Sequence, residues 1–333
     1  LKPFTKKIPE TEKAEFNGGA KFCNGDTVMA RITPCLENGK TAYVDMLDDG
    51  EIGFGSTEFI VMRAKAGISD PQFVYYTAIN PVFRNVAIKS MVGSSGRQRV
   101  QQSVLEELEL SVPDLDEQRR IGDFLARIDE KIALNDRIND NLQQQAMALY
   151  AEMFLNSSDD NVTSGTLSDI AVITMGQSPS GSSYNEDGVG EVFYQGRAEF
   201  GFRFPKRRLF TTEPKRMAEA GDVLLSVRAP VGDLNIAYER CCIGRGLGAI
   251  HSKTGHSSFV LYTMFALRSQ LDIFNGEGTV FGSINRDALN AIPIDIPPVT
   301  EIDQFEVVAH PIDELIRANY EENCRLEAIR DSL

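Results

Sequence analysis

Residues 125–149 read LARIDEKIALNDRINDNLQQQAMAL, and residues 309–326 read AHPIDELIRANYEENCRL. Each segment repeats apolar residues at heptad spacing and places two asparagines on the apolar stripe, at the same two points. The first stripe consists of Leu125, Ile128, Ile132, Asn135, Asn139, Leu142, Ala146 and Leu149, and the second, at an offset of 184, of Ala309, Ile312, Ile316, Asn319, Asn323 and Leu326. A buried asparagine lowers stability unless it meets a polar partner, so the matched asparagines predict that the two helices pair.

The duplication extends beyond the two helices. Each helix is preceded by a short apolar segment, expected to be a strand, and by a proline; Asp116 and Thr300 are the expected N-caps. The matched segments are Leu108–Pro113 with Ile292–Pro297, Cys23–Val28 with Glu219–Leu224, and Phe73–Thr77 with Phe259–Thr263. Upstream offsets drift between 186 and 196, as loop insertions would cause. The chain is therefore predicted to be a tandem duplication.

Hydrophobic patterning gives each copy a mixture of strands and helices. In the first copy we expect strands at 27–33, 41–46 and 57–63 and a helix at 71–89; in the second, strands near 170–174, 192–194, 223–228, 235–238 and 247–251 and a helix near 258–274. The predicted fold class is α+β, a tandem pseudo-two-fold repeat of two α+β domains joined by two long helices. The predicted segments are a first domain at 1–113, a central helix at 114–156, a second domain at 157–298 and a C-terminal helix at 299–333. The small, polar residues Ser157–Gly165 predict a linker.

The two copies differ in length at their starts. The second copy has roughly 56 residues between Gly165 and Gly221, whereas the first has 24 before Gly25 and begins without a methionine. We therefore expect the first domain to lack its initial strands.

Charge is distributed unevenly along the chain, whose net charge is -14. Residues 1–113 and 161–298 each carry 13 basic and 14 acidic side chains, whereas 114–160 carry 5 against 11 and 299–333 carry 3 against 9. The nearly neutral domains can present a basic face to nucleic acid, while the acidic helices suit protein partners. Five cysteines form no disulfide framework, and no segment has the length of a membrane span, so a cytoplasmic protein without membrane contact is the expectation.

Catalytic signatures are missing from the sequence. It contains no phosphate-binding GxxxxGK[ST] loop, no HExxH helix and no GxSxG elbow. The three histidines, His251, His256 and His310, have no companions at metal-ligand spacing. These observations predict a binding protein with no catalytic residue and no metal site.

Glycine-bounded loops in both domains carry side chains that suit DNA. Lysine and arginine neutralise phosphates, serine and threonine anchor the backbone, and arginine, asparagine and glutamine can read base edges. The candidate DNA-binding residues are Arg31, Thr33, Asn38, Lys40, Arg97, Gln98 and Arg99 in the first domain, and Ser178, Arg197, Arg203, Lys206, Arg207, Arg208, Arg228 and Arg245 in the second. Any one of them could equally be an ordinary solvated side chain. The run Lys206–Arg208 has additional weight because Phe204 flanks it.

Several motifs resemble those of the DNA specificity subunit of type I restriction-modification systems. The matching stretches are Gly25–Lys40, Gly55–Phe59, Gly93–Val100 and Glu117–Ile121 in the first copy, and Gly176–Pro179, Ser226–Gly232 and Ile243–Leu247 in the second. The resemblance covers essentially the whole chain. One departure lies in the second helix, which has Glu301-Ile302 where the first has Glu117-Gln118.

The resemblance implies a division of labour within a larger complex. Each of two target recognition domains would read one half of a bipartite sequence in double-stranded DNA, and the helices would hold the halves at a fixed gap. A helix of about 39 residues would span roughly 58 Å, enough to separate two domains by a turn of DNA. Two methyltransferase subunits would dock on the helices and supply S-adenosylmethionine chemistry, and a restriction and translocase subunit would use ATP. This chain would bind no cofactor itself.

The direction of helix pairing is left open by the spacing. Antiparallel pairing sets Asn135 against Asn323 and Asn139 against Asn319, whereas parallel pairing exchanges the partners, and both satisfy the polar layers. The resemblance favours the antiparallel arrangement.

Three other functions are compatible with parts of the pattern. A coiled-coil scaffold or binding module without DNA sequence specificity would need the helices but not the basic loops. A self-contained methyltransferase or nuclease would modify DNA alone, and a carbohydrate-binding module would show no salt-sensitive association with DNA.

Overall fold

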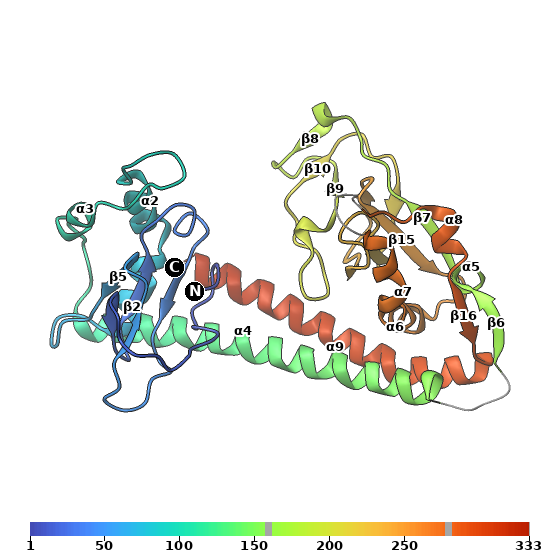
Figure 1. Ribbon diagram of the computed structural model, residues 1–333, viewed down its shortest axis with the longest axis horizontal. Helices are drawn as coiled ribbons and strands as arrows, with labels where there is room; N and C mark the ends of the chain where they lie inside the picture. The colour runs from blue at the N-terminus through green and yellow to red at the C-terminus, as the bar shows by residue number, and fades with distance from the viewer. Residues whose placement is uncertain (157–161, 277–281, 333) are drawn as a thin grey trace. The chain divides into compact units, whose positions relative to one another are not determined.

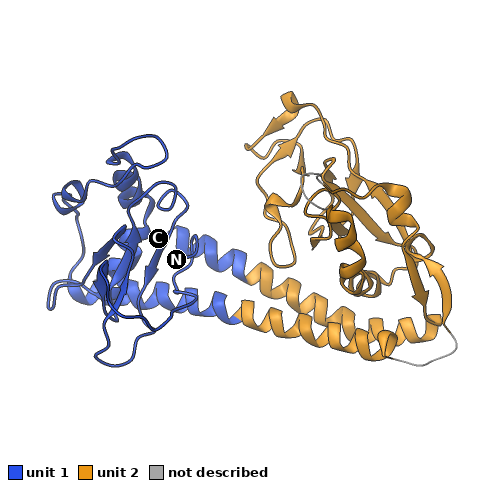
Figure 2. Ribbon diagram, viewed as in Figure 1, with its two compact units in different colours: residues 1–134, 323–333 blue, residues 135–322 orange. Residues whose placement is uncertain are grey.

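The computed structural model describes residues 1–156, 162–276 and 282–332. The chain forms two compact units, Leu1–Leu134 with Asn323–Leu333, and Asn135–Glu322 (Figure 2). The unit boundaries cut through the two long helices, α4 (Leu115–Tyr150) and α9 (Val299–Asp331), so each unit contains a domain and part of both helices. The division into four segments at 113, 156 and 298 stays a prediction.

Unit 1 is built around a three-stranded antiparallel sheet with the order β3-β2-β5 (Figure 1). Its strands are β1 (Ala20–Phe22), β2 (Thr27–Ala30), β3 (Thr41–Tyr43), β4 (Gly53–Gly55) and β5 (Phe59–Met62), and its short helices are α1 (Pro71–Ile79), α2 (Pro81–Lys89) and α3 (Gln102–Glu106). Strand β2 is buried on both faces: Met29 packs with Leu36 and Phe83, and Val28 packs with Val44. This central strand holds the loops that follow it.

The helix predicted over 71–89 is two helices. Pro81 begins α2, and Asn80 caps it by accepting a hydrogen bond from Val82 N at 2.9 Å. Because proline disfavours the α conformation in the residue before it and lacks a donor, the chain turns at Asn80. The prediction of one continuous helix was wrong at this point.

Unit 2 contains two main sheets, with the orders β13-β12-β15-β7 and β11-β14-β9-β10-β8, and a separate pair, β16-β6. The strands are β6 (Thr163–Thr166), β7 (Ala171–Met175), β8 (Tyr184–Asn185), β9 (Glu191–Tyr194), β10 (Phe210–Thr211), β11 (Met217–Ala218), β12 (Val223–Ser226), β13 (Leu234–Ile236), β14 (Cys241–Ile243), β15 (Leu247–Ser252) and β16 (Pro293–Ile296). Its short helices are α5 (Leu167–Ile170), α6 (Ser257–Ala266), α7 (Arg268–Asp272) and α8 (Arg286–Asn290). All pairings are antiparallel except that of β14 with β9.

Three predicted boundaries in and around unit 2 need correction. The helix expected near 258–274 is divided into α6 and α7, with Leu267 between them. Part of the expected linker, Thr163–Gly165, belongs to strand β6, and the rest of it at 157–161 lies outside the described residues. Strand β16 pairs with β6, but 108–112 in the first copy form no strand among the described residues.

The N-cap of α4 lies two residues earlier than predicted. Asp114 Oδ1 accepts a hydrogen bond from Glu117 N at 2.9 Å, so Asp114 is the N-cap and Asp116 lies in the first turn. Thr300 likewise lies inside α9, which begins at Val299. At the N-cap of α4, the Asp114 carboxylate satisfies a free backbone donor and interacts favourably with the helix dipole.

Within unit 2, α4 and α9 run antiparallel. Asn319 Nδ2 donates to Asn139 Oδ1 at 2.8 Å, and Asn135 Nδ2 donates to Glu322 Oε2 at 2.8 Å. Further along, the ring of Tyr150 packs on that of Phe305. From one contact to the next, the residue number increases on α4 and decreases on α9, which shows that the two helices are antiparallel.

The predicted seam residues are largely withdrawn from solvent. Leu125, Ile128, Asn135, Asn139, Ala146, Ala309, Ile316 and Asn323 are buried, and Ile132, Leu142, Leu149, Ile312, Asn319 and Leu326 are half-buried. In unit 2 the core of the domain is continuous with this seam, since Ala146, Tyr150, Phe305 and Ala309 share one cluster with Phe259 and Leu261. The helices therefore serve as part of the domain core.

The two copies attach their domains to the helices with different residues at equivalent positions. In unit 1, Asp70 caps α1 by accepting from Phe73 N at 2.9 Å, and Gly122 of α4 leaves room for it, because a Cβ there would lie 2.8 Å from Asp70 Oδ1. In unit 2, the residue equivalent to Gly122 is Glu306 of α9, whose carboxylate accepts from Ser258 N and Phe259 N at 3.1 Å. The capping side chain therefore belongs to the domain in unit 1 and to the long helix in unit 2.

Gln118 of α4 and its equivalent in α9, Ile302, also contact their domains in different ways. Gln118 is buried, donates to the Ile68 and Pro113 carbonyls and accepts from Asp70 N. Ile302 is buried in the apolar core of unit 2. A polar link to one domain is thus replaced by an apolar one in the other.

The chain folds as two tandem α+β domains with two long helices, as predicted. Among the described residues, no helix is long and apolar enough to cross a membrane.

Candidate nucleic-acid interface

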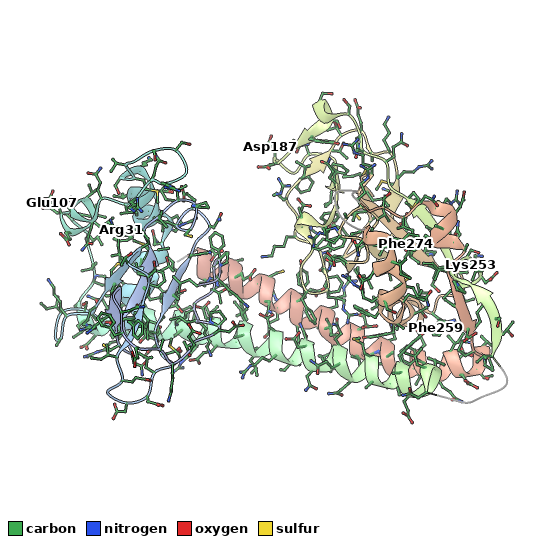
Figure 3. The ribbon with its side chains drawn as sticks, in the orientation of Figure 1. Arg31, Glu107, Asp187, Lys253, Phe259 and Phe274 are labelled. Carbon is green, nitrogen blue, oxygen red and sulfur yellow. The ribbon has the colours of Figure 1, made fainter. Side chains whose placement is uncertain are left out.

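In unit 1, the structure brings two of the predicted loops together. The loop after β2 carries Arg31 and Thr33, and it pairs with the segment that ends the loop at 93–99. Thr33 N donates to Gln98 O at 3.0 Å, and Val100 N donates to Arg31 O at 2.9 Å. Arg31, labelled in Figure 3, therefore lies beside Arg99 although 68 positions separate them in sequence.

Glu58 joins these two arginines. Arg99 donates to both carboxylate oxygens of Glu58, with the shortest contact at 2.7 Å, and Arg31 Nε lies 3.6 Å from Oε2. Hydrogen bonds from Arg99 lower the pKa of Glu58. Glu58 was missed as a site residue, although it stands in the Gly55–Phe59 motif that carried the resemblance.

The other candidates in unit 1 differ in exposure. Arg97 and Asn38 are exposed, and Lys40 and Gln98 are half-buried. Thr33 Oγ1 donates to Glu37 Oε1 at 2.9 Å, which holds the turn that contains Asn38. Arg97 extends from a glycine-bounded loop and has no ion-pair partner among the described residues.

Unit 2 repeats the pairing of the first loop. Ala229 N donates to Gly282 O at 3.0 Å, and Arg228 and Ser283 form the bridge equivalent to Ile32 and Arg99. The equivalents lie at offsets of 196 and 184, so the duplication includes the loop geometry. Gly282 and Ser283 were missed because their sequence lacks the arginines of the first copy.

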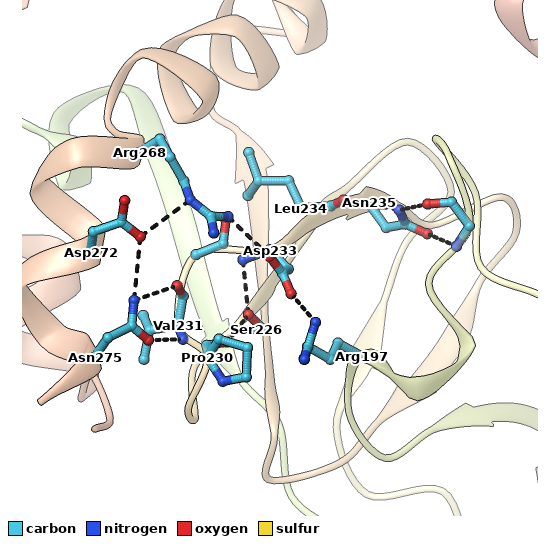
Figure 4. Close-up of polar contacts among 12 residues, drawn as sticks. Arg197, Ser226, Pro230, Val231, Asp233, Leu234, Asn235, Arg268, Asp272 and Asn275 are labelled. Atoms are coloured by element: carbon cyan, nitrogen blue, oxygen red, sulfur yellow. Dashed lines mark hydrogen bonds and ion pairs between the residues drawn. The ribbon is translucent and has the colours of Figure 1, made fainter. Parts of the chain in front are cut away.

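Asp233 organises the loop that presents Arg228. Its backbone N donates to Ser226 Oγ at 2.9 Å, and its carboxylate forms ion pairs with Arg197 and Arg268 (Figure 4). Asn275 braces the same loop by accepting from Val231 N. Arg228 itself is exposed and has no ion-pair partner in the described part of the chain.

A second pair of loops meets beside this one. Ser178 Oγ accepts from Arg245 N at 3.2 Å, and Gln177 N donates to Ile243 O at 3.0 Å. Glycines make this approach possible, since a Cβ at Gly176 would lie 2.1 Å from Gly244 O. The Arg245 side chain is exposed.

The basic run in unit 2 is partly neutralised by acids. Arg207 is ion-paired to Glu239, and Arg208 is ion-paired to Glu199 and Glu186. Lys206 is exposed and has no ion-pair partner within the described ranges. The Arg208–Glu186 pair is exposed on both sides and contributes only about 0–1 kcal/mol, so a phosphate can displace Glu186. Glu199 is buried, so its pair with Arg208 is not of this exposed kind.

Arg203 and Phe204 do not belong to the exposed surface. The Arg203 side chain is 3% exposed and contacts Asp313 at 2.9 Å, and Phe204 is packed against Tyr238 and Tyr320. Both side chains hold the loop to α9. We therefore remove Arg203 from the candidate DNA contacts and Phe204 from the support for the basic run; the remaining assignments stay predictions.

Comparison with known proteins gives the family. The model described as the type I restriction modification DNA specificity domain matches residues 5–144 and again 159–323. A Methanocaldococcus jannaschii protein named as a specificity subunit of the type I restriction enzyme MjaX is 28% identical over 331 residues, which cover 93% of this chain and 76% of that protein. The Escherichia coli EcoAI specificity subunit is 35% identical over 130 residues, 39% of this chain and 21% of that protein.

The fold has a counterpart among solved structures. The S subunit of a type I restriction-modification system from M. genitalium superimposes with a TM-score of 0.57 at 17% identity, covering 96% of this chain and 83% of that one. With the family model matching both halves, the chain belongs to the type I restriction modification DNA specificity domain family and contains two copies of its domain.

Proposed function

We propose that this chain is the DNA specificity subunit of a type I restriction-modification complex. Each recognition domain would read one half of a bipartite target in double-stranded DNA. The observation that carries this proposal is the family match to both halves of the chain, at residues 5–144 and 159–323. The repeated pairing of a post-strand loop with a second loop, Ile32 with Arg99 and Arg228 with Ser283, supports two similar reading heads.

Among the candidate DNA-binding residues, the cations that have no ion-pair partner in the described part of the chain are the best candidates for phosphate contacts. They are Lys40, Arg97, Lys206, Arg228 and Arg245. Binding a phosphate through these residues breaks no internal ion pair, whereas Arg31, Arg99, Arg197, Arg207 and Arg208 must release or share a carboxylate. Paired arginines have a fixed orientation, which suits reading base edges.

The long helices would set the gap between half-sites and dock the partner subunits. At 36 residues, α4 has a length of roughly 54 Å. The acidic excess on both helical segments would repel DNA and favour a basic protein surface. We propose that two methyltransferase subunits bind here and that a restriction and translocase subunit joins them.

The chemistry would belong to these partners. S-adenosylmethionine would bind the methyltransferase subunits and ATP the translocase, while this chain would bind no cofactor and select the adenine to be methylated. The absence of nucleophile and metal motifs from the sequence supports a non-catalytic role.

Mapping modified adenines tests the proposal. The full-length protein is co-expressed with its methyltransferase partner in a host without DNA methylation, and modified positions are read from genomic DNA. We expect one bipartite motif with a constant spacer. No modification, or modification without a defined sequence, would contradict the proposal.

Substitution of the basic run separates this function from that of a coiled-coil scaffold. Changing Lys206, Arg207 and Arg208 together to alanine should weaken DNA association and flatten its salt dependence, because fewer counterions are released. Arg240→Ala, at an exposed arginine of the same unit paired to Glu191, is the control. A scaffold would show the same DNA association in all three proteins.

A further inference from the structure

Unit 2 contains a triad, with two buried members and a partly exposed aspartate, that joins its domain to helix α9. Tyr262 of α6 donates through its hydroxyl to Asp313 Oδ1 at 2.9 Å, and Arg203 Nη1 contacts the same oxygen at 2.9 Å. The Arg203 guanidinium lies 5.8 Å from the centroid of the Tyr262 ring. An arginine only 3% exposed is thus neutralised by a carboxylate and covered by an aromatic face.

Unit 1 contains a related arrangement on helix α4, in which the cation bonds to the tyrosine hydroxyl where Arg203 bonds to the carboxylate of Asp313. The Tyr76 hydroxyl of α1 donates to Asp129 Oδ2 at 2.6 Å, and Lys6 Nζ donates to the Tyr76 hydroxyl at 3.0 Å. Lys6 Nζ also lies 4.8 Å from the centroid of the Tyr76 ring. The cation again comes from the domain and the aspartate from the long helix.

The two triads are equivalent in the duplication. Asp129 and Asp313 are separated by 184 residues, the offset of the helices, and Tyr76 and Tyr262 by 186, the offset of the helix segments they belong to. Lys6 and Arg203, 197 residues apart, accept equivalent backbone hydrogen bonds: Tyr43 N of β3 donates to Lys6 O at 2.9 Å, and Ile236 N of β13 donates to Arg203 O at 2.8 Å. All three positions therefore correspond, although the cation has changed from lysine to arginine.

The other long helix completes each triad within the same unit. Gln143 of α4 accepts a hydrogen bond from Arg203 Nη2 at 3.0 Å, and Arg330 of α9 contacts Asp129 Oδ1 at 3.0 Å. Each triad thus joins one domain to both helices. Apolar packing tolerates sliding and rotation, whereas buried, directional hydrogen bonds to a charge define one orientation.

We propose that these triads are orientation latches, and that Lys6 and Arg203 are positioning residues for the reading of DNA. In unit 2 the latch controls the loop that carries the basic run, because Lys206 lies three residues after Arg203 and Phe204 between them is packed on Tyr320. Releasing a latch lets its domain rotate on the helices, so recognition of that domain's half-site is lost first. This inference rests on the proposed function.

The test uses variants that remove one oxygen atom, remove one charge, or exchange one cation for another. Tyr76→Phe and Tyr262→Phe delete a single hydroxyl from each latch, Arg203→Met removes the cation, and Arg203→Lys installs the cation of unit 1. Arg240→Met, an exposed arginine of unit 2 outside the latch, is the control. Each variant of the full chain is co-expressed with the methyltransferase partner, modified adenines are mapped, and thermal unfolding is measured on the purified complex.

We expect Tyr262→Phe and Arg203→Met to relax recognition at one half-site, with roughly tenfold more methylation of targets mismatched in that half, as the loss of a hydrogen bond to a charged group implies. Tyr76→Phe should relax the opposite half-site. Arg203→Lys should retain most of the selectivity, and Arg240→Met all of it.

A purely structural role would lower the unfolding temperature and total methylation while leaving the motif unchanged at both halves, and that result would overturn the latch proposal. Equal relaxation at both half-sites would also overturn it. If the unmodified chain itself gives no bipartite motif, the proposed function has failed instead, so the two failures are distinguishable.

Discussion

Asn139 and Asn319 form a side-chain hydrogen bond of 2.8 Å between helices α4 and α9 in unit 2. Asn139 is 4% exposed, so its amide depends on this partner instead of water. The bond fixes the register of two antiparallel helices, since a shift by one heptad would place each asparagine against an apolar residue.

Replacing Asn139 and Asn319 with leucine, singly and together, should show that the pair fixes the helix register at a cost in stability. Asn139→Leu alone should lower the free energy of unfolding by about 1–3 kcal/mol, because Asn319 loses its partner. The double change to leucine should raise it by about 1 kcal/mol relative to the unmodified chain, because two apolar side chains meet. Chemical denaturation measures both, and Asn141→Leu at an exposed position of α4 is the control.

Changing all four seam asparagines, Asn135, Asn139, Asn319 and Asn323, to leucine should also loosen the spacing between half-sites. Methylation mapping would then show targets with more than one spacer length. A single unchanged spacer would mean that the domains, and not the helices, determine the distance.

Glu58 should restrain DNA binding by unit 1. Glu58→Gln removes the charge that Arg31 and Arg99 share, so both guanidinium groups become free for phosphate. We expect tighter association with all DNA sequences and a steeper dependence on salt. Glu107→Gln, at an exposed position of the same unit, should change neither property. Weaker binding by Glu58→Gln would show that orientation of the arginines matters more than their charge.

Asp26 should make stability sensitive to acid. Burial acts to raise the pKa of Asp26, but hydrogen bonds from Arg63 and from Cys23 N outweigh it, so the pKa is lowered in the folded state. A lowered folded pKa gives stabilisation that is present above the unfolded value of about 3.9 and is lost as the pH falls through the folded value. The stability difference between the unmodified chain and Asp26→Asn should therefore shrink below about pH 4. Asp49→Asn, at an exposed aspartate of the same unit, is the control.

Gly122 should tolerate no side chain. A Cβ at this position would lie 2.8 Å from Asp70 Oδ1 and 3.1 Å from Phe73 N, so Gly122→Ala should separate α4 from α1 and lower the free energy of unfolding by about 1–3 kcal/mol. Gly181→Ala, where a Cβ meets nothing within 4 Å, is the matched control. Equal stabilities of the two variants would contradict the packing described for unit 1.

The helix seam and the duplication could be predicted because their signals are local and periodic. Heptad spacing determines which side of a helix is buried, and equal offsets identify equivalent residues without knowledge of their contacts. Pro81 also offered a local signal for the end of α1, but the apolar pattern continues across it and obscured the break. Strands β8, β10 and β11 have two residues each, too few to show alternation.

The burial and ion pairing of the charged residues could not be predicted in this way. Arg203 is buried because it pairs with Asp313, which lies 110 positions away in sequence. Glu58 pairs with Arg99, which lies 41 positions away. Basic composition indicates that a loop carries cations, but burial and pairing depend on tertiary contacts. The list of candidate DNA contacts therefore stays a prediction, shortened by one residue.

The Gly122 and Glu306 exchange limits how domains can be recombined. In one copy the domain brings its own helix cap and requires an empty place on the long helix, while in the other the long helix provides the cap. A chimera that transplanted the second domain onto the first helix would leave two backbone donors of α6 without an acceptor, and the reverse transplant would force Asp70 against a carboxylate. Working hybrids must therefore inherit each domain together with the helix that follows it.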